Sequence, residues 1–205
     1  MKILFIGGTG IISTACAELA VQRGLDLTLL NRGHGKNIDG TRQLVADIND
    51  VASAKKVLGD TRWDVVVDFI SFTPDDLKKR LEIFRGKVGQ FVFISTASAY
   101  QKPIIDYLVT ESTPLVNPFW PYSRDKIDCE LYLNRELREN GFPVTIIRPS
   151  YTYGETVLPV SFNSWERPYT VIDRMRKGLP VIIPGDGTSL WQLTHNADFA
   201  KGLLG

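Results

Sequence analysis

The chain has 205 residues, of which 43% are hydrophobic, and this fits one domain with a large core better than two domains. Its 24 Lys and Arg residues nearly balance its 23 Asp and Glu residues, so no overall charge attracts nucleic acid or an anionic membrane. No apolar run approaches the roughly 20 residues that a membrane-spanning helix requires, and no signal-peptide pattern opens the chain. The two cysteines, Cys16 and Cys129, favour buried free thiols in a cytoplasmic protein over a disulfide framework.

Short apolar runs rich in β-branched residues alternate with longer segments of helical periodicity, which is typical of βαβ units and a parallel sheet. The expected strands are 2–6, 25–30, 42–46, 65–70, 90–95 and 144–148. The expected helices are 11–24, 50–58, 74–85, 122–140 and 196–204. The handedness of parallel crossovers then favours an α/β fold with a doubly wound sheet, whose ligands bind beyond the carboxyl ends of the strands.

A glycine-rich turn follows the first expected strand and opens the first expected helix. Its glycines let the backbone turn sharply and bring N–H groups against a pyrophosphate at the positive end of the helix. Ser13 stands where the usual pattern has its third glycine, and a plain tight turn without a ligand is the alternative interpretation. The candidate cofactor residues here are Gly7, Thr9, Gly10, Ile11 and Ile12.

Asn31 and Arg32 follow the second expected strand, and no carboxylate that would bind the ribose 2′-hydroxyl of NAD stands there. Arg32 can form a bidentate contact with a 2′-phosphate and stack on adenine, which favours NADP over NAD. A solvated surface arginine is the alternative.

Tyr122 and Lys126 lie one helical turn apart at the start of the helix that follows the fifth expected strand. A neighbouring cation favours the phenolate and moves a tyrosine pKa from near 10 towards working pH. The fifth strand delivers Thr96 at its carboxyl end, where its hydroxyl can bind the substrate oxygen that the tyrosine deprotonates. A polar loop that satisfies its own backbone is the alternative for 95–98.

In order and spacing, these features resemble the NAD-dependent epimerase/dehydratase family, the extended branch of the short-chain dehydrogenase/reductases. The resemblance rests on the glycine loop, Asp47-Ile48, Phe93-Ile94-Ser95-Thr96 with Tyr100, Tyr122 with Lys126, Ile147-Arg148-Pro149, and 185–188 with 193–195 and Asp198. It implies a Rossmann-like dinucleotide-binding domain at 1–150, a partial substrate lobe with a return segment at 151–205, and a homodimer. Family members normally continue beyond this length, so the resemblance also implies a chain shortened at its C-terminus.

The resemblance assigns a role to each matching residue. Tyr122 is the acid/base, Lys126 binds the nicotinamide ribose and lowers the tyrosine pKa, and Thr96 orients the substrate hydroxyl. Asp47 and Ile48 meet the adenine, although Asp47 also suits a turn or a helix cap. The nicotinamide side of the cofactor channel is implied to contain Phe69, Ile70, Ser71, Pro149 and Ser150.

Two departures bear on the substrate. Trp191 and Gln192 stand where nucleotide-sugar members place an arginine on the substrate diphosphate, and Ser150 and Tyr151 follow the Arg-Pro pair in place of Gly-Asn. We expect no metal at His34 or His195, and we expect packing rather than stacking roles for Trp120, Trp165 and Trp191.

Two functions compete. The first is an NAD(P)-dependent oxidoreductase or epimerase/dehydratase acting on a hydroxyl- or carbonyl-bearing small molecule. The second is a cofactor-holding protein with little catalysis, similar to plant chloroplast relatives that bind RNA. The balanced charge disfavours the second, because RNA binding draws on several Lys and Arg contacts to phosphates.

Overall fold

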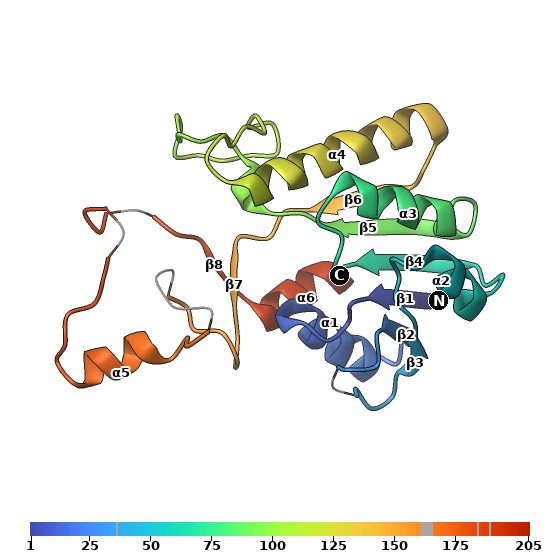
Figure 1. The fold of residues 1–205 in the computed structure, drawn as a ribbon, viewed down its shortest axis with the longest axis horizontal. Helices are drawn as coiled ribbons and strands as arrows, with labels where there is room; N and C mark the ends of the chain where they lie inside the picture. Colours follow the sequence, from blue (N-terminus) through green and yellow to red (C-terminus); the bar gives the residue numbers. More distant parts are fainter. Residues whose placement is uncertain (36, 161–165, 184, 189) are drawn as a thin grey trace.

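A computed structural model describes residues 1–35, 37–160, 166–183, 185–188 and 190–205. Six parallel strands form one sheet in the order β3-β2-β1-β4-β5-β6, which confirms the doubly wound α/β fold (Figure 1). The strands are β1 (Lys2–Ile6), β2 (Asp26–Asn31), β3 (Arg42–Val45), β4 (Trp63–Asp68), β5 (Val88–Ile94) and β6 (Val144–Ile147). Each lies within two residues of its expected bounds. The order reverses direction at β1, so the loops after β1 and β4 face each other across the switch point.

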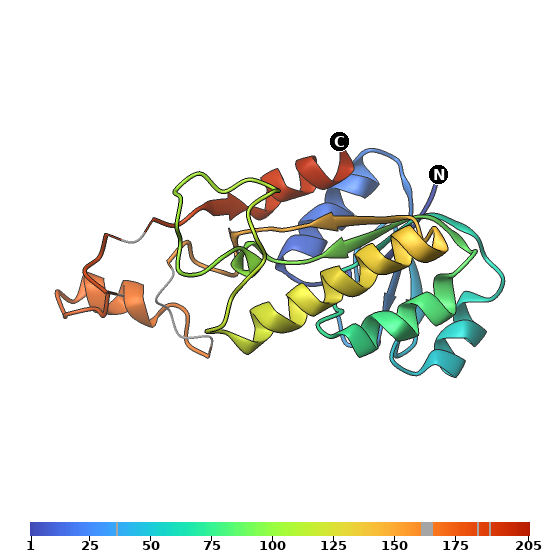
Figure 2. The ribbon, with the colours of Figure 1, turned by 90° about the horizontal axis from the view of Figure 1, so that it is seen from above.

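Helices cover both faces of the sheet (Figure 2). One layer holds α1 (Ile11–Gln22) and α6 (Asn196–Leu204), and the other holds α2 (Val51–Leu58), α3 (Pro74–Phe84) and α4 (Pro121–Asn140). Alternate side chains of each strand enter the two cores: Leu4 and Ile6 pack towards α2, α3 and α4, while Ile3 and Phe5 pack towards α1 and α6. Burial on both faces explains the nearly continuous hydrophobicity of these strands.

Local signals set the starts of the helices that carry the site. At α3, the Thr73 hydroxyl accepts from the Asp76 amide, the Asp76 carboxylate accepts from the Thr73 amide, and Pro74 occupies the first turn. At α4, Pro121 follows Trp120 at the start, and Gly141 in the left-handed conformation ends the helix. Tyr122 therefore lies in the first turn of α4, close to the carboxyl edge of the sheet.

Residues after 150 form an arm and then return to the core (Figure 1). Strand β7 (Tyr151–Tyr153) pairs in parallel with β8 (Leu193–His195), and α5 (Thr170–Arg176) lies between them in sequence. Phe199 and Ala200 of α6 are buried against α1. The division at residue 150 into a cofactor domain and a substrate lobe stays a prediction. Within the described residues, no helix combines the length and the apolar character needed to cross a membrane.

Candidate active site

The loop after β1 has no room for side chains at two of its glycines. A Cβ atom on Gly7 would lie 2.2 Å from Ile70 Cγ2, and one on Gly8 would lie 2.7 Å from Leu29 Cδ2. The Ser13 hydroxyl accepts from the Gly10 amide at 2.7 Å and donates to the Gly7 carbonyl at 2.9 Å, so it ties the turn to the helix. The first N–H groups of any helix have no intrahelical partner, and α1 has no acidic residue in its first turn. This cradle fits a pyrophosphate.

Replacing Gly7 by alanine is expected to destabilise the fold, because Gly7 has φ +80° and Ile70 occupies the space of a Cβ. Gly24→Ala is a matched control, since Gly24 has φ +67° but nothing within 4 Å of a Cβ. Both variants carry the left-handed backbone cost of about 1–2 kcal/mol. We expect Gly7→Ala to lose about 1 kcal/mol or more beyond Gly24→Ala in urea unfolding. Equal losses of stability in the two variants would show that the Ile70 side chain can move aside without cost.

The structure places the expected adenine-side residues at the ends of β2 and β3. Arg32 is exposed, and within the described residues its guanidinium makes no hydrogen bond or ion pair. The Asn31 amide is already engaged, because it accepts from Gly33 N at 2.8 Å and donates to Gln43 at 3.0 Å. Asp47 accepts from the Asn49 amide at 2.9 Å, which is the turn role that its sequence also allowed.

Tyr122 and Thr96 come together from α4 and from the end of β5. Burial raises the pKa of the Tyr122 phenol, and a hydrogen bond with the Thr96 side chain opposes this shift. The Tyr122 ring lies 4.8 Å from the ring of Trp120 and 6.3 Å from that of Phe72, measured between centroids. The phenol is therefore protonated at neutral pH and held beside a hydroxyl.

A chain of hydroxyls continues from this pair. Thr96 Oγ1 lies 3.0 Å from Ser98 Oγ, which in turn lies 2.8 Å from Ser123 Oγ on α4. The Asn117 amide donates to the Ser98 carbonyl at 2.7 Å. The short helix η1 (Ala97–Ala99) is thus fixed against the first turn of α4, and with it the position of Thr96 relative to Tyr122.

Lys126 is 2% exposed and points into the protein. Its Nζ donates to the carbonyls of Ser71 at 2.7 Å and Ile94 at 2.8 Å, and it lies 4.6 Å from the Phe93 ring centroid. Burial lowers the Lys126 pKa to about 8, opposed most by the Asp68 carboxylate. The net pKa of Tyr122 is raised by burial rather than lowered, although Lys126 Nζ lies 5.9 Å from the centroid of its ring. The role of Lys126 in lowering the Tyr122 pKa stays a prediction.

The loop after β4 lies between the glycine turn and Lys126. Phe69 packs edge-on against Phe5, and Ile70 contacts Gly7. Ser71 is fully buried and its hydroxyl donates to Asp68 at 2.6 Å, so its side chain does not line an open channel as expected. On the far side, the Pro149 carbonyl accepts from the Ala97 amide at 2.8 Å, which joins the loops after β5 and β6.

An ion pair between a buried carboxylate and a partly exposed arginine fixes those two loops. The Arg148 guanidinium binds both carboxylate oxygens of Glu130, with the shortest contact at 2.7 Å, and also donates to the Tyr100 hydroxyl at 3.0 Å. The Glu130 carboxylate is fully buried and also accepts from the Ser95 hydroxyl. This pair anchors α4 to both strand ends that border Tyr122.

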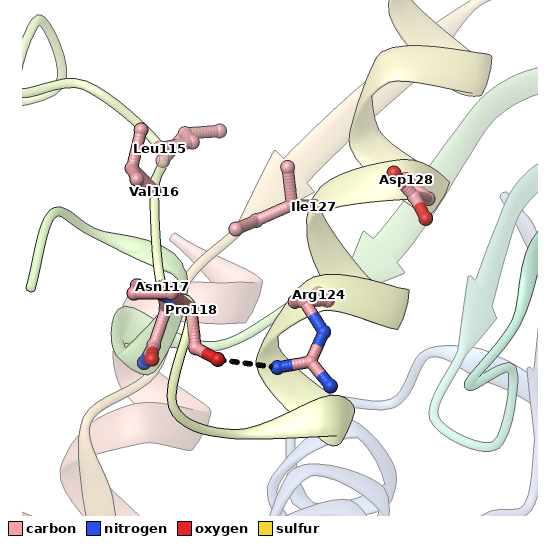
Figure 3. A pocket seen from close by; sticks show the side chains of 7 residues that line it. All are labelled: Leu115, Val116, Asn117, Pro118, Arg124, Ile127 and Asp128. Atoms are coloured by element: carbon pink, nitrogen blue, oxygen red, sulfur yellow. Dashed lines mark hydrogen bonds between the residues drawn. The ribbon is translucent and has the colours of Figure 1, made fainter.

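A surface pocket lies on the outer side of α4 and contains none of the expected site residues (Figure 3). Two of its lining residues hold the loop that leads into α4: Asn117 binds Ser98, and Arg124 Nη1 donates to the Pro118 carbonyl at 2.7 Å. We therefore assign this loop a supporting role for Tyr122.

His195, Trp120 and Trp191 take structural positions outside the Tyr122 site or at its edge. His195 Nδ1 accepts from the Ala197 amide and caps α6. Trp120 and Trp191 are each about half exposed, and the Trp191 ring lies edge-on to Tyr151 with centroids 5.9 Å apart, so neither fills the core. Trp165 lies outside the described residues.

Sequence reasoning missed the buried polar side chains that support the site, which are Asp68, Arg80, Asn117, Ser123 and Glu130. Two of them carried a signal. Arg80 shares the apolar face of α3 with Leu77 and Leu81, and Glu130 lies one turn after Lys126 on the buried face of α4. A charged residue in an apolar stripe indicates a buried partner.

Comparison with known proteins decides the family. The model of the NAD dependent epimerase/dehydratase family matches residues 3–204. The chain belongs to this family. It is 29% identical to the chloroplast stem-loop binding protein of 41 kDa b of Arabidopsis thaliana, over 99% of this chain and 54% of that protein. It is 30% identical to a UDP-glucose 4-epimerase of Lactobacillus helveticus, over 72% of this chain and 51% of that protein.

The chain thus spans about half the length of these two family members. Among solved structures, it resembles the UDP-glucose 4-epimerase of Thermus thermophilus in complex with NAD, with a TM-score of 0.78 and 24% identity. That match covers all of this chain and 73% of the epimerase. At this identity, the likeness supports the shared fold.

Proposed function

We propose that this epimerase/dehydratase family member binds a nicotinamide dinucleotide across the carboxyl edge of the sheet and acts on a hydroxyl- or carbonyl-bearing small molecule. The observation that carries the proposal is the pairing of Tyr122 with Thr96 at the edge that also holds the glycine cradle. The bound cofactor would supply hydride transfer to or from a substrate carbon.

Residues of this chain would hold the cofactor at each of its parts. Because the amides of Gly7 and Gly10 already donate within the protein, the amides of residues 8, 9 and 11–13 would hold the pyrophosphate. The exposed guanidinium of Arg32 suits a 2′-phosphate. An ammonium has three donors, and Ser71 and Ile94 accept two from Lys126. Lys126 is buried in this structure, and its third donor would bind the ribose once the cofactor is in place. The NAD-bound epimerase of Thermus thermophilus supports a cofactor of this class.

Proton transfer would belong to Tyr122. Because its pKa is raised, the phenol keeps its proton at neutral pH and can donate it to a substrate carbonyl oxygen. Thr96 would hold the same oxygen, and its own position is fixed by Ser98. In the opposite direction, Tyr122 would take the proton from a hydroxyl.

The substrate would be sugar-related but without a nucleoside diphosphate. The relatives from Lactobacillus helveticus and Thermus thermophilus are UDP-glucose epimerases by name. Trp191, however, stands where the resemblance places an arginine on the diphosphate, and it packs against Tyr151.

A cytoplasmic setting fits the two buried thiols, which lie on opposite faces of the sheet.

Binding and turnover test the proposal together. Calorimetry should detect uptake of NADP(H) or NAD(H), and a panel of sugars, aldehydes and ketones should include at least one substrate that is turned over.

The Arabidopsis relative favours a second candidate function, a cofactor-holding protein that binds an RNA stem-loop. RNA binding in a gel-shift assay, with no turnover of any panel member, would reverse the ranking.

Arg32→Ala tests the choice between the two cofactors. Loss of a charged hydrogen bond to a 2′-phosphate should weaken NADPH binding by about tenfold or more and leave NADH binding nearly unchanged. Arg42→Ala is the control. Arg42 is also exposed, but it lies at the amino end of β3, away from the carboxyl edge of the sheet where Arg32 lies. Equal losses for both cofactors would remove Arg32 from this role.

A further inference from the structure

A buried charged network lies behind Lys126 and uses residues to which the proposed chemistry assigns no role. The Asp68 carboxylate, fully buried at the end of β4, accepts from the amides of Ile70 at 2.9 Å and Ser71 at 3.0 Å and from the Ser71 hydroxyl. It also pairs with Arg80 Nε at 3.2 Å. The backbone at 70–71 is therefore wrapped around one carboxylate.

Arg80 extends this network to the loop after β3. Its side chain is fully buried, and Nη1 donates to the Ile48 carbonyl and to Asn49 Oδ1, each at 3.1 Å. Its Nη2 is buried without a hydrogen-bond partner among the described residues. A buried ion pair offers little net stability over an apolar replacement, so its presence here calls for another role.

The network ends at Lys126. The Ser71 carbonyl, whose own amide and hydroxyl are held by Asp68, is one of the two acceptors of the Lys126 ammonium. We propose that Asp68 is a positioning residue for Lys126: by binding the amide and hydroxyl of Ser71, it fixes the Ser71 carbonyl that holds the ammonium. This inference rests on the proposed function, in which Lys126 contacts the cofactor ribose.

Several groups act on the charge of Lys126. Burial lowers its pKa, while Asp68 from β4, Asp76 from α3, and Cys129 and Glu130 from α4 raise it. Asp68 is the largest of these opposing contributions, and Arg80 lies directly behind it. Removing the Asp68 charge should therefore let Lys126 lose its proton at a lower pH.

The test follows Lys126 itself by NMR of protein labelled with ¹³Cε-lysine, with the resonance assigned by its absence in Lys126→Met. The native midpoint should lie near pH 8. In Asp68→Asn it should fall by about one to three pH units. Asp128→Asn is the matched control, because Asp128 is an exposed carboxylate two positions after Lys126 on α4. The Lys126 midpoint in this variant should equal the native one.

Asp68→Asn leaves the buried Arg80 charge without its carboxylate partner, and this could prevent folding. A second variant therefore removes both charges. Asp68→Asn combined with Arg80→Met removes both charges together. Its Lys126 midpoint should also fall, though by less. An unchanged midpoint in either folded variant would overturn the inference.

This readout separates the inference from the proposed function. If no cofactor binds and no substrate is turned over, the proposed function fails, and the NMR midpoints still decide the role of Asp68. If turnover is found, its pH profile should move to lower pH in the same variants. Turnover with an unshifted Lys126 midpoint would leave the proposed function intact and remove Asp68 from it.

Discussion

Tyr122→Phe is expected to lower kcat on the best substrate of the panel by about 10²- to 10⁴-fold, the usual contribution of a positioned acid/base. The phenylalanine keeps the ring that packs against Trp120 and Phe72 and removes only the hydroxyl next to Thr96. Cofactor affinity, measured by calorimetry, should change little, because the pyrophosphate cradle lies on a different loop. The substitution should therefore lower kcat and leave the affinity for the cofactor nearly unchanged.

Tyr132→Phe is the matched control for this prediction. Tyr132 lies on the same helix, is half-buried and interacts with Glu136 at the far end of α4. Its hydroxyl should be dispensable for turnover. If Tyr122→Phe retained native turnover, the acid/base would have to be another group, and the proposed mechanism would be wrong.

Glu130→Gln is expected to destabilise the protein by about 1–3 kcal/mol, the cost of weakening charged hydrogen bonds at a buried carboxylate whose arginine partner is partly exposed. The substitution keeps the shape of the side chain but removes the charge that binds Arg148 at two oxygens. It also weakens the acceptor of the Ser95 hydroxyl. Urea unfolding followed by circular dichroism measures the loss.

Glu139→Gln provides the comparison for Glu130, since Glu139 is exposed near the end of the same helix. Its stability should stay within about 0.5 kcal/mol of the native protein. A stability loss in Glu130→Gln no larger than in this control would mean that Arg148 does not depend on the ion pair. The anchoring role assigned to Glu130 would then have to be withdrawn.

The sheet was predictable because its strands are buried on both faces and therefore read as continuous apolar runs. The end of β4 shows where this signal stops. Phe69 and Ile70 continue the apolar run, so the sequence predicts a strand through residue 70. In the structure, the Asp68 carboxylate accepts from the amides of Ile70 and Ser71 and turns the chain away from the sheet. A side chain that captures the backbone in this way leaves no mark on hydrophobic periodicity.

The short pairing of β7 with β8 escaped prediction for a different reason. Tyr151–Tyr153 and Leu193–His195 are each three residues long and far apart in sequence, so neither shows a usable period. Helix α5 has only seven residues and lies between them. Partners at such a separation are set by tertiary contacts rather than by local pattern.

The positions of the candidate site residues in the fold were easier to predict than their electrostatics. The spacing of Tyr122 and Lys126 indicates one helix face, and the structure places both at the start of α4. Spacing alone could not show that the ammonium is held by the carbonyls of Ser71 and Ile94, which come from two other strand ends. Burial lowers the pKa of Lys126 and the Asp68 carboxylate opposes that shift, and Asp68 is far from Lys126 in sequence, so only the fold shows it.

A crystal structure of the protein with NADP tests the central claim most directly. We expect the diphosphate against the amides of residues 8, 9 and 11–13, the 2′-phosphate at Arg32, and the nicotinamide ring facing the Tyr122 hydroxyl. A dinucleotide bound elsewhere, or a Tyr122 hydroxyl directed away from the ring, would contradict it.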